Sequence, residues 1–201
     1  MNRVKYAIVP LCGLALLIGS IVFAKAKPTI AVMDFKNKTA YGGYQLGSGA
    51  ADMLTTQLFK TRKFSVVERD KLKSLMKEQE IGATGLVDKK AAEIGKLIGA
   101  EYLVVGSVTE YGVSRSKGGA MGISGTKTEY RTTVDVRIIN AATGEVVFAD
   151  SGSGSESSSS ANVFGIGGGD TTSFDEKKAQ ESMRKALIDV CDKIKKEEIK
   201  D

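Results

Sequence analysis

Histidine is absent from this chain of 201 residues. Its absence removes the side chain that most often acts as a general base, and also the commonest nitrogen ligand for zinc. Cysteine is nearly absent, because the chain has only Cys12, in an N-terminal apolar segment, and Cys191, near the C-terminus. If the N-terminal segment is removed, a single cysteine remains, and an intramolecular disulfide is excluded even in an oxidising compartment.

The first 26 residues have the pattern of an export signal. Two basic residues precede an apolar run, Ala7–Phe23, and a small-x-small cleavage site ends at residue 26. We therefore expect 1–26 to be a signal peptide and the mature protein to lie in the periplasm or at the outer membrane. An uncleaved anchor is the alternative, but Pro10 interrupts the run and a bilayer requires ~20 apolar residues. Leu11 precedes Cys12 where a lipid-attachment site has a small residue, so we expect no acylation there.

The net charge gives no indication of a nucleic-acid partner. The chain has 29 basic and 24 acidic residues, a formal net charge of +5, and three of the basic residues but no acidic ones lie in 1–26. The remaining net charge of +2 is too small to predict nucleic-acid binding. About 175 residues remain, which suits a single domain over 27–201 with a substantial core.

The first half of the mature chain alternates between strand and helix patterns. Apolar runs rich in strand formers predict strands, and apolar residues recurring at helical spacing predict helices between them. The predicted strands are Thr29–Phe35, Phe64–Val67 and Tyr102–Val108; the predicted helices start near Leu46, Asp70 and Asp88, and Gly99 ends the last one. Because Tyr102–Val108 is apolar on both faces, we expect a central strand of an α/β layer.

The second half predicts an antiparallel hairpin and a final helix. Apolar and polar residues alternate strictly over Tyr130–Ile138, as in a strand with one solvated face, and Asn140–Gly144 turns the chain back into Glu145–Ala149. An apolar stripe that includes Cys191 then predicts an amphipathic C-terminal helix, with this cysteine as a small buried hydrophobe. The predicted fold class is therefore α/β, with a mixed sheet flanked by helices.

Two segments rich in glycine and serine interrupt this hairpin region: Gly112–Thr128 and Ser151–Ser173. Both contain too little apolar surface to bury a core, so the sequence predicts mobile loops or extended β-hairpins. Nothing in the predicted α/β layer requires them. We therefore expect folding to survive without them.

No arrangement of residues indicates an enzyme. Glu68, Asp70 and Glu78, with Arg69 among them, are carboxylates that catalysis could use, but they lie where a strand passes into a helix. There Asp70 is expected to cap the helix, and the charges are more simply the solvated start of that helix. The glycine clusters lack the strand-loop-helix context and the Lys-Ser/Thr ending of phosphate-binding loops. We expect no catalytic activity and no cofactor or metal.

Three stretches of the chain carry a family resemblance. They read VVERDKLKSLMKEQEIGATGLVD, AAEIGKLIGAEYLVVGSVTEY and VDVRIINAATGEVVFAD. In this order and spacing they resemble the curli secretion channel family, CsgG, over about Ile30 to Ile194. The resemblance implies a periplasmic α/β domain that forms a ring in the outer membrane, where each subunit lends two β-hairpins to a shared barrel. It also implies export of amyloid-forming subunits through a constriction, without chemistry, and hence homo-oligomers and a secreted β-rich polypeptide or another envelope protein as partners.

The resemblance also assigns roles to segments by position. Gly112–Thr128 and Ser151–Ser173 would be the two membrane hairpins, and the loop Lys36–Tyr44 would form the constriction. The implied hairpin residues are Val113, Met121 and Ile123 in the first segment and Val163, Phe164 and Ile166 in the second; the aromatic candidates of the constriction are Tyr41 and Tyr44. Taken alone, both tyrosines could equally be ordinary aromatics that pack a loop beside a helix.

The side-chain pattern of the two segments leaves a second function open. A membrane strand needs ~9–11 residues with an apolar side chain at every second position. Val113, Met121 and Ile123 share one parity of the sequence, but basic residues of the same segment share it too, and Ser151–Ser160 has no apolar side chain. The chain could thus be a subunit of an oligomeric export channel. Alternatively, it could be a periplasmic adaptor or activator that binds another envelope protein and forms no pore.

Overall fold

The computed structural model describes residues 26–78, 87–121, 123–163 and 174–197. Residues 1–25 of the expected signal peptide lie outside the described residues, as do Phe164 and Ile166 of the second predicted hairpin.

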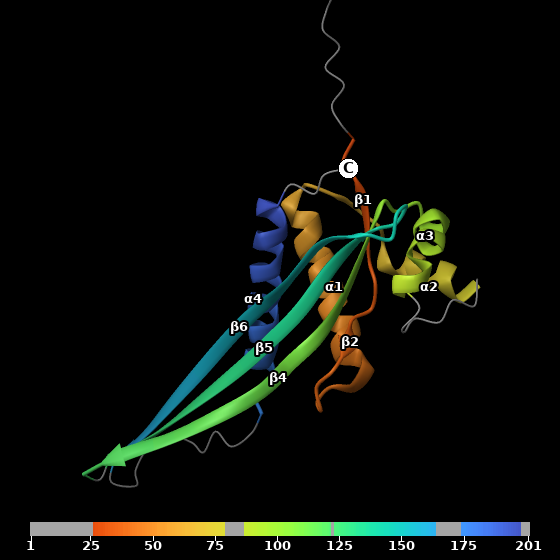
Figure 1. Ribbon diagram of the computed structural model, residues 1–201. Coiled ribbons are helices and arrows are strands. Elements are labelled where there is room, and N and C mark those ends of the chain that lie inside the picture. The colour runs from red at the N-terminus through yellow and green to blue at the C-terminus, as the bar shows by residue number, and fades with distance from the viewer. Residues whose placement is uncertain (1–25, 79–86, 122, 164–173, 198–201) are drawn as a thin grey trace, which may run out of the picture.

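A mixed sheet forms the centre of the molecule (Figure 1). Its strands are β1 (Thr29–Val32), β2 (Lys36–Asn37), β3 (Ser65–Val66), β4 (Tyr102–Ala120), β5 (Ile123–Asn140) and β6 (Val146–Val163), in the order β3-β1-β4-β5-β6, with β2 also pairing with β4. The short strands run parallel to their neighbours, whereas β4, β5 and β6 form an antiparallel meander. The predicted mixed sheet is confirmed.

Helices cover both faces of the inner part of this sheet. The helices are α1 (Gly43–Thr61), α2 (Arg69–Glu78), α3 (Val87–Ile98) and α4 (Glu176–Lys196). One core lies between the sheet and the pair α1 and α4, where Leu54 and Leu187 are fully buried; the other lies under α2 and α3, around Leu72 and Ile94. Side chains of β4 alternate between the two cores, with Val104 in the first and Leu103 in the second. This alternation is why Tyr102–Val108 is apolar at successive positions.

Each predicted element is present, with shifted ends. Gly99 has φ of 68° after α3, as expected of a glycine that ends a helix. The even-numbered residues of Tyr130–Ile138 are all buried, and Gly144, at φ 78°, lies in the turn before β6. Cys191 is buried on α4, and burial raises the pKa of its thiol to about 12. Asp70 departs from the prediction, because α2 begins at Arg69 and Asp70 therefore lies within its first turn.

A β-bulge changes the orientation of β4 halfway along its length. Val108 is opposite Val134 and Glu110 is opposite Thr133, so Thr109 is an extra residue in β4. Even-numbered side chains of β4 face α1 and α4 before the bulge, and odd-numbered ones face that side after it, since residues directly opposite share a face. Tyr111, beyond the bulge, accordingly packs against the same core as Val108.

Candidate functional site: the strand extension and the cavity beside it

The three long strands continue together past most of the helical cover as one outgrowth of the body, with α4 still against its root at Gly154 (Figure 1). We call this part the extension; it comprises Tyr111–Ala120 of β4, Ile123–Thr132 of β5 and Gly154–Val163 of β6. Gly112–Thr128 lies within the hairpin of β4 and β5. The second segment is described only over Ser151–Val163, which is a single strand that pairs with β5. A second separate hairpin would require residues outside the described ones.

The extension has no apolar face. Val113 is opposite Tyr130, on the side of α4, together with Arg115 and Lys117. Ile123, seven residues before Tyr130 on β5, therefore lies on the other face. The shared parity of Val113 and Ile123 in the sequence does not place them together, because the turn between the two strands separates them. Serine, glycine and charged side chains make up most of both faces.

The apolar positions lie instead at the tip of the extension. Met121 is 95 % exposed, with φ of 52°, and Ile123 is 53 % exposed. The register places Ile123 opposite Ala120 on one side and opposite Val163 on the other. Three of the residues that the CsgG resemblance assigns to hairpins, Met121, Ile123 and Val163, thus meet at this one end.

The outer part of β4 forms an open edge of the sheet. β2 pairs with β4 at Ser107 and Val108, and from Tyr111 to Ala120 no strand of the described residues pairs with this edge. Unpaired N–H and C=O groups along such an edge can accept a strand of another chain.

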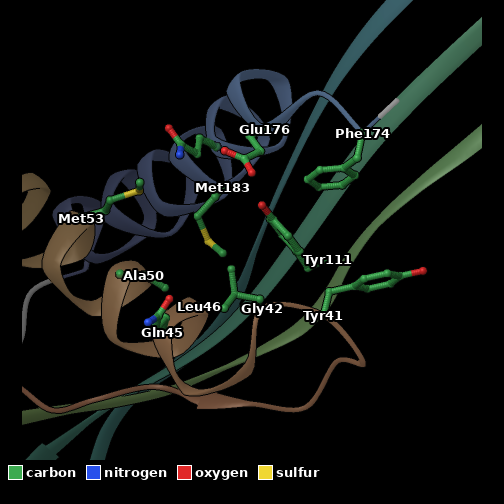
Figure 2. Close-up of a pocket in the computed structure, with 12 residues that line it drawn as sticks. Tyr41, Gly42, Gln45, Leu46, Ala50, Met53, Tyr111, Phe174, Glu176 and Met183 are labelled. Carbon is green, nitrogen blue, oxygen red and sulfur yellow. The ribbon is translucent and has the colours of Figure 1, made fainter. Parts of the chain in front are cut away.

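A cavity of about 540 Å³ opens beside the root of the extension, between α1 and α4 (Figure 2). Tyr111 of β4, Leu46 of α1 and Met183 of α4 point toward one another across it, and Phe174 and Glu176 lie on the side of α4. The remaining lining residues are Tyr41, Gly42, Gln45, Gly49, Ala50, Met53 and Gln180.

One carboxylate gives this mainly apolar cavity its charge. Glu176 is the only charged side chain among the described residues that line it. Burial, and then the negative charge of Glu176, raise the pKa of the Tyr111 hydroxyl, which therefore stays protonated at neutral pH. The Phe174 ring contacts both Tyr111 and Tyr130, with ring centroids 6.2 and 5.7 Å apart. The arrangement can hold a cationic side chain with an aliphatic stem, because aromatic faces and a carboxylate both attract such a group.

The two tyrosines of the predicted constriction loop lie in different surroundings. Tyr41 is 56 % exposed at the edge of the cavity, whereas Tyr44 does not line it and donates a hydrogen bond from its hydroxyl to Asp34. The segment that leads to them is held by Asn37, whose side chain accepts from the Thr39 N–H at 2.9 Å and donates to the Gly43 carbonyl at 2.9 Å. The loop therefore has a defined conformation built on one asparagine.

Arg69 is paired with Asp34, the carboxylate to which Tyr44 donates. It is 4 % exposed, bonds to the carboxylates of Asp34 and Asp52, and donates to the Val32 carbonyl at 2.9 Å. Burial acts to raise the pKa of Asp34, but the hydrogen bonds from Tyr44 and Arg69, with the positive charges of Arg69 and Lys73, outweigh it and hold this pKa below its ordinary value. The expected solvated helix start is wrong for Arg69, which is a buried, paired cation.

Comparison with known proteins bears on the function of this arrangement. The model of the family described as "Curli production assembly/transport component CsgG" matches residues 17–201. The chain belongs to the CsgG family. This confirms the resemblance found in the sequence.

Individual proteins similar to this CsgG-family chain share a third or less of its residues in the aligned regions. A protein of Neisseria meningitidis serogroup B (strain ATCC BAA-335 / MC58) named as an inferred lipoprotein, NMB1126/NMB1164, is 32% identical over 158 residues, or 73% of this chain. The chain spans 65% of the length of that relative.

Among solved structures, the hypothetical protein CT253 from Chlamydia trachomatis has a TM-score of 0.50 at 12% identity, over 85% of this chain and 97% of that one. Lipoprotein GNA1162 from Neisseria meningitidis has a TM-score of 0.48 at 17% identity, over 65% of this chain and 84% of that one. At 12% identity, the likeness to CT253 shows a shared fold alone.

No helix within the described ranges combines the length and apolar character needed to cross a membrane.

Proposed function

We propose that this CsgG-family chain is an exported, non-enzymatic envelope protein that acts in the secretion or assembly of an extracellular β-rich polypeptide. In this proposal it works as a homo-oligomer whose subunits join through their extensions. Family membership supports the envelope setting. The observation that carries the oligomer is the extension itself, since three long strands leave the body with an open β4 edge and little apolar side-chain surface.

Strand pairing suits this surface better than side-chain packing. Serine and glycine contribute little apolar area. Because burying apolar area contributes only ~25 cal/mol per Å², the extension gains little free energy from hydrophobic contact with a neighbour. Its backbone N–H and C=O groups are nevertheless regularly spaced, and a neighbouring strand can bond to them whatever the side chains are. An oligomeric export channel is the specific form of this proposal, with the extensions forming its wall.

The test is to shorten the extension and measure the oligomer. Because Val113 is opposite Tyr130, replacing residues 114–129 by Asn-Gly would close a two-residue hairpin at that point. We expect the full-length chain purified in detergent to form a closed oligomer by light scattering and electron microscopy, and to conduct ions in planar bilayers. The shortened variant should remain folded but become monomeric and lose conductance.

The matched control keeps the strands and changes only the tip. Met121→Ser with Ile123→Ser alters two exposed side chains and should leave the oligomer in place. A wild-type chain that is monomeric at every concentration would contradict the oligomer. An oligomer that survives shortening would show that subunits join elsewhere, and an oligomer without conductance would remove the channel.

The cavity supports a second candidate, an adaptor that binds another envelope protein without forming a pore. With Glu176 as the single charge among aromatic and apolar walls, the cavity would take a lysine or arginine side chain of the partner. Hexylammonium should therefore bind more tightly than hexanol, as measured by chemical-shift changes at Tyr111. Glu176→Gln should remove this preference, whereas Glu181→Gln, at an exposed position that pairs with Arg184, should keep it. Equal binding of the two probes to the wild-type protein would exclude the cationic site.

A further inference from the structure

The outer edge of β6 is protected by side chains of α4. β6 is the last strand in the sheet order and runs for 18 residues, so its far edge would otherwise present a long row of unpaired backbone groups. Such an edge is a template for adding a strand of another chain.

The helix lies directly against the strand at two glycines. A Cβ atom at Gly152 would lie 2.1 Å from the Ala186 carbonyl oxygen, and one at Gly154 would lie 2.1 Å from the Ser182 carbonyl oxygen. Both distances are far below van der Waals contact, so only glycine permits this approach. It brings the polar side chains of α4 within reach of the strand edge.

Three lysines of α4 bond to backbone carbonyls along this edge. Lys193 donates to the Ser151 carbonyl at 2.6 Å, Lys185 to that of Ser155 at 3.2 Å, and Lys178 to that of Ser157 at 3.1 Å. Their spacing of seven and eight residues corresponds to about two helical turns each, which places all three on one face of the helix.

A carboxylate of the same helix completes the row. The Ser153 N–H donates to the Asp189 carboxylate at 3.2 Å. Ser151, Ser153, Ser155 and Ser157 are alternate residues, and the backbone groups of alternate residues in a strand point to the same edge. Helix side chains therefore bond to a backbone group at four consecutive edge positions where a neighbouring strand would bond.

Acidic groups hold the lysines in place. Glu156 pairs with Lys185, while Asp150 and Asp189 lie 3.3 and 3.4 Å from Lys193. The hydrogen bond from Lys185 lowers the pKa of Glu156. Burial acts to lower the pKa of Lys193, but the hydrogen bonds and negative charges of Asp150 and Asp189 together outweigh it and raise this pKa. Glu156 and Lys193 are thus charged at neutral pH.

We propose that Lys178, Lys185, Lys193 and Asp189 form an edge guard that prevents the Ser151–Ser157 edge of β6 from pairing with a strand of a second copy of this chain. Lys178 lies in the first turn of α4 and reaches Ser157, and β6 continues past it to Val163. Pairing between copies is therefore confined to the outer stretch of β6, beyond the guard. This inference deepens the proposed function, because it takes strand pairing between copies as the mode of assembly.

The experiment removes the lysine donors but keeps most of the length of each side chain. The guard variant carries Lys178→Met, Lys185→Met and Lys193→Met. The control variant carries Lys177→Met, Lys195→Met and Lys196→Met, which makes the same change in charge at three exposed positions of the same helix. The full chain of each is compared with wild type by sedimentation velocity over a range of concentrations, with circular dichroism and urea unfolding to establish that each folds.

We expect the guard variant to self-associate about tenfold more tightly than the control, which corresponds to ~1.4 kcal/mol. Adding Ser155→Pro should return association to the control level, because proline removes an edge N–H and its ring obstructs an approaching strand. If the triple variant does not fold, the single Lys185→Met substitution supplies the test and should give a smaller increase in the same direction.

The outcomes separate this inference from the proposed function. Equal association of guard and control variants, or association that the proline does not reverse, would overturn the guard whether or not the wild-type chain forms an oligomer. A monomeric wild-type chain whose guard variant associates reversibly would support the guard and contradict the proposed native oligomer.

Discussion

The inner and outer halves of β4, β5 and β6 are built on one continuous hydrogen-bonded ladder but have opposite side-chain character. In the inner half, Val104, Val136 and Phe148 are buried in a core, with helices on both faces of the sheet. In the outer half, the same strands carry mostly serine, glycine and charged residues. The comparison shows that backbone pairing can extend a sheet well beyond the point where apolar burial stabilises it. An outer half of this kind depends on the inner half for its stability and is available for contacts with other chains.

The largest expected effect concerns the buried cation of the inner half. Arg69→Met should lower the free energy of unfolding by ~3–5 kcal/mol, because Asp34, whose side chain is only 9 % exposed, would lose its cationic partner. Urea unfolding at pH 7 measures this. In the outer half, Arg131→Gln removes an exposed pair with Glu129 and should leave the free energy of unfolding almost unchanged. Similar losses for both substitutions would mean that the two halves do not differ as described.

The contact between α4 and β6 provides the next test. Gly152→Ala should destabilise the fold by ~1–3 kcal/mol, since the new methyl group overlaps the Ala186 carbonyl. Gly118→Ala is the matched substitution in the extension, where nothing lies within 4 Å of the added atom. It should leave the urea midpoint almost unchanged. A stable Gly152→Ala variant would show that α4 can move away from β6.

Acid should affect the inner half through Asp34. Its pKa is lower in the folded chain than the ordinary 3.8, so the stability that it contributes is fully present above about pH 4 and is lost as the pH falls through the folded value. Asp34→Asn should therefore lose less stability than wild type between pH 5 and pH 3, as measured by urea unfolding at each pH. Parallel curves for the two proteins would assign the acid sensitivity to other carboxylates.

The smallest effect is expected at the tip. Met121→Ser and Ile123→Ser change side chains that are already exposed, so each should alter the free energy of unfolding by less than ~0.5 kcal/mol. Thermal unfolding measures this directly. A clear loss of stability would indicate that the tip is buried in an assembly under the conditions of the measurement.

The sequence predicts the inner half well because the spacing of its apolar residues follows from which side chains are buried. Tyr102–Val108 and Tyr130–Ile138 carry patterns that directly reflect one covered face or two, and the structure confirms both. The burial of Arg69 cannot be inferred from the local sequence, since its partners Asp34 and Asp52 are 35 and 17 residues away in the chain. A charged residue beside other charged residues is indistinguishable, by local pattern, from a solvated one.

The candidate site was predicted only in part, for a related reason. The β4–β5 hairpin could be foreseen, but a strand made of serine and glycine has no side-chain alternation from which to infer its partner. The expectation that folding survives without Ser151–Ser173 stays a prediction, and it now includes the loss of the contact between Gly152 and α4. The cavity combines residues of the loop, α1, β4 and α4, and the lysine row depends on a helix meeting a strand edge. Both arise from tertiary packing, which single-sequence patterns do not record.

The extra residue at Thr109 has a consequence for comparing this chain with its relatives. A homologue that lacks one residue at this point would exchange the two faces of the whole outer part of β4, so that Arg115 and Lys117 would point away from α4 and Ser114 and Ser116 toward it. A single gap in an alignment would then alter more of the surface than several substitutions. Chains that differ there should be grouped by the length of this strand before their outer residues are compared column by column.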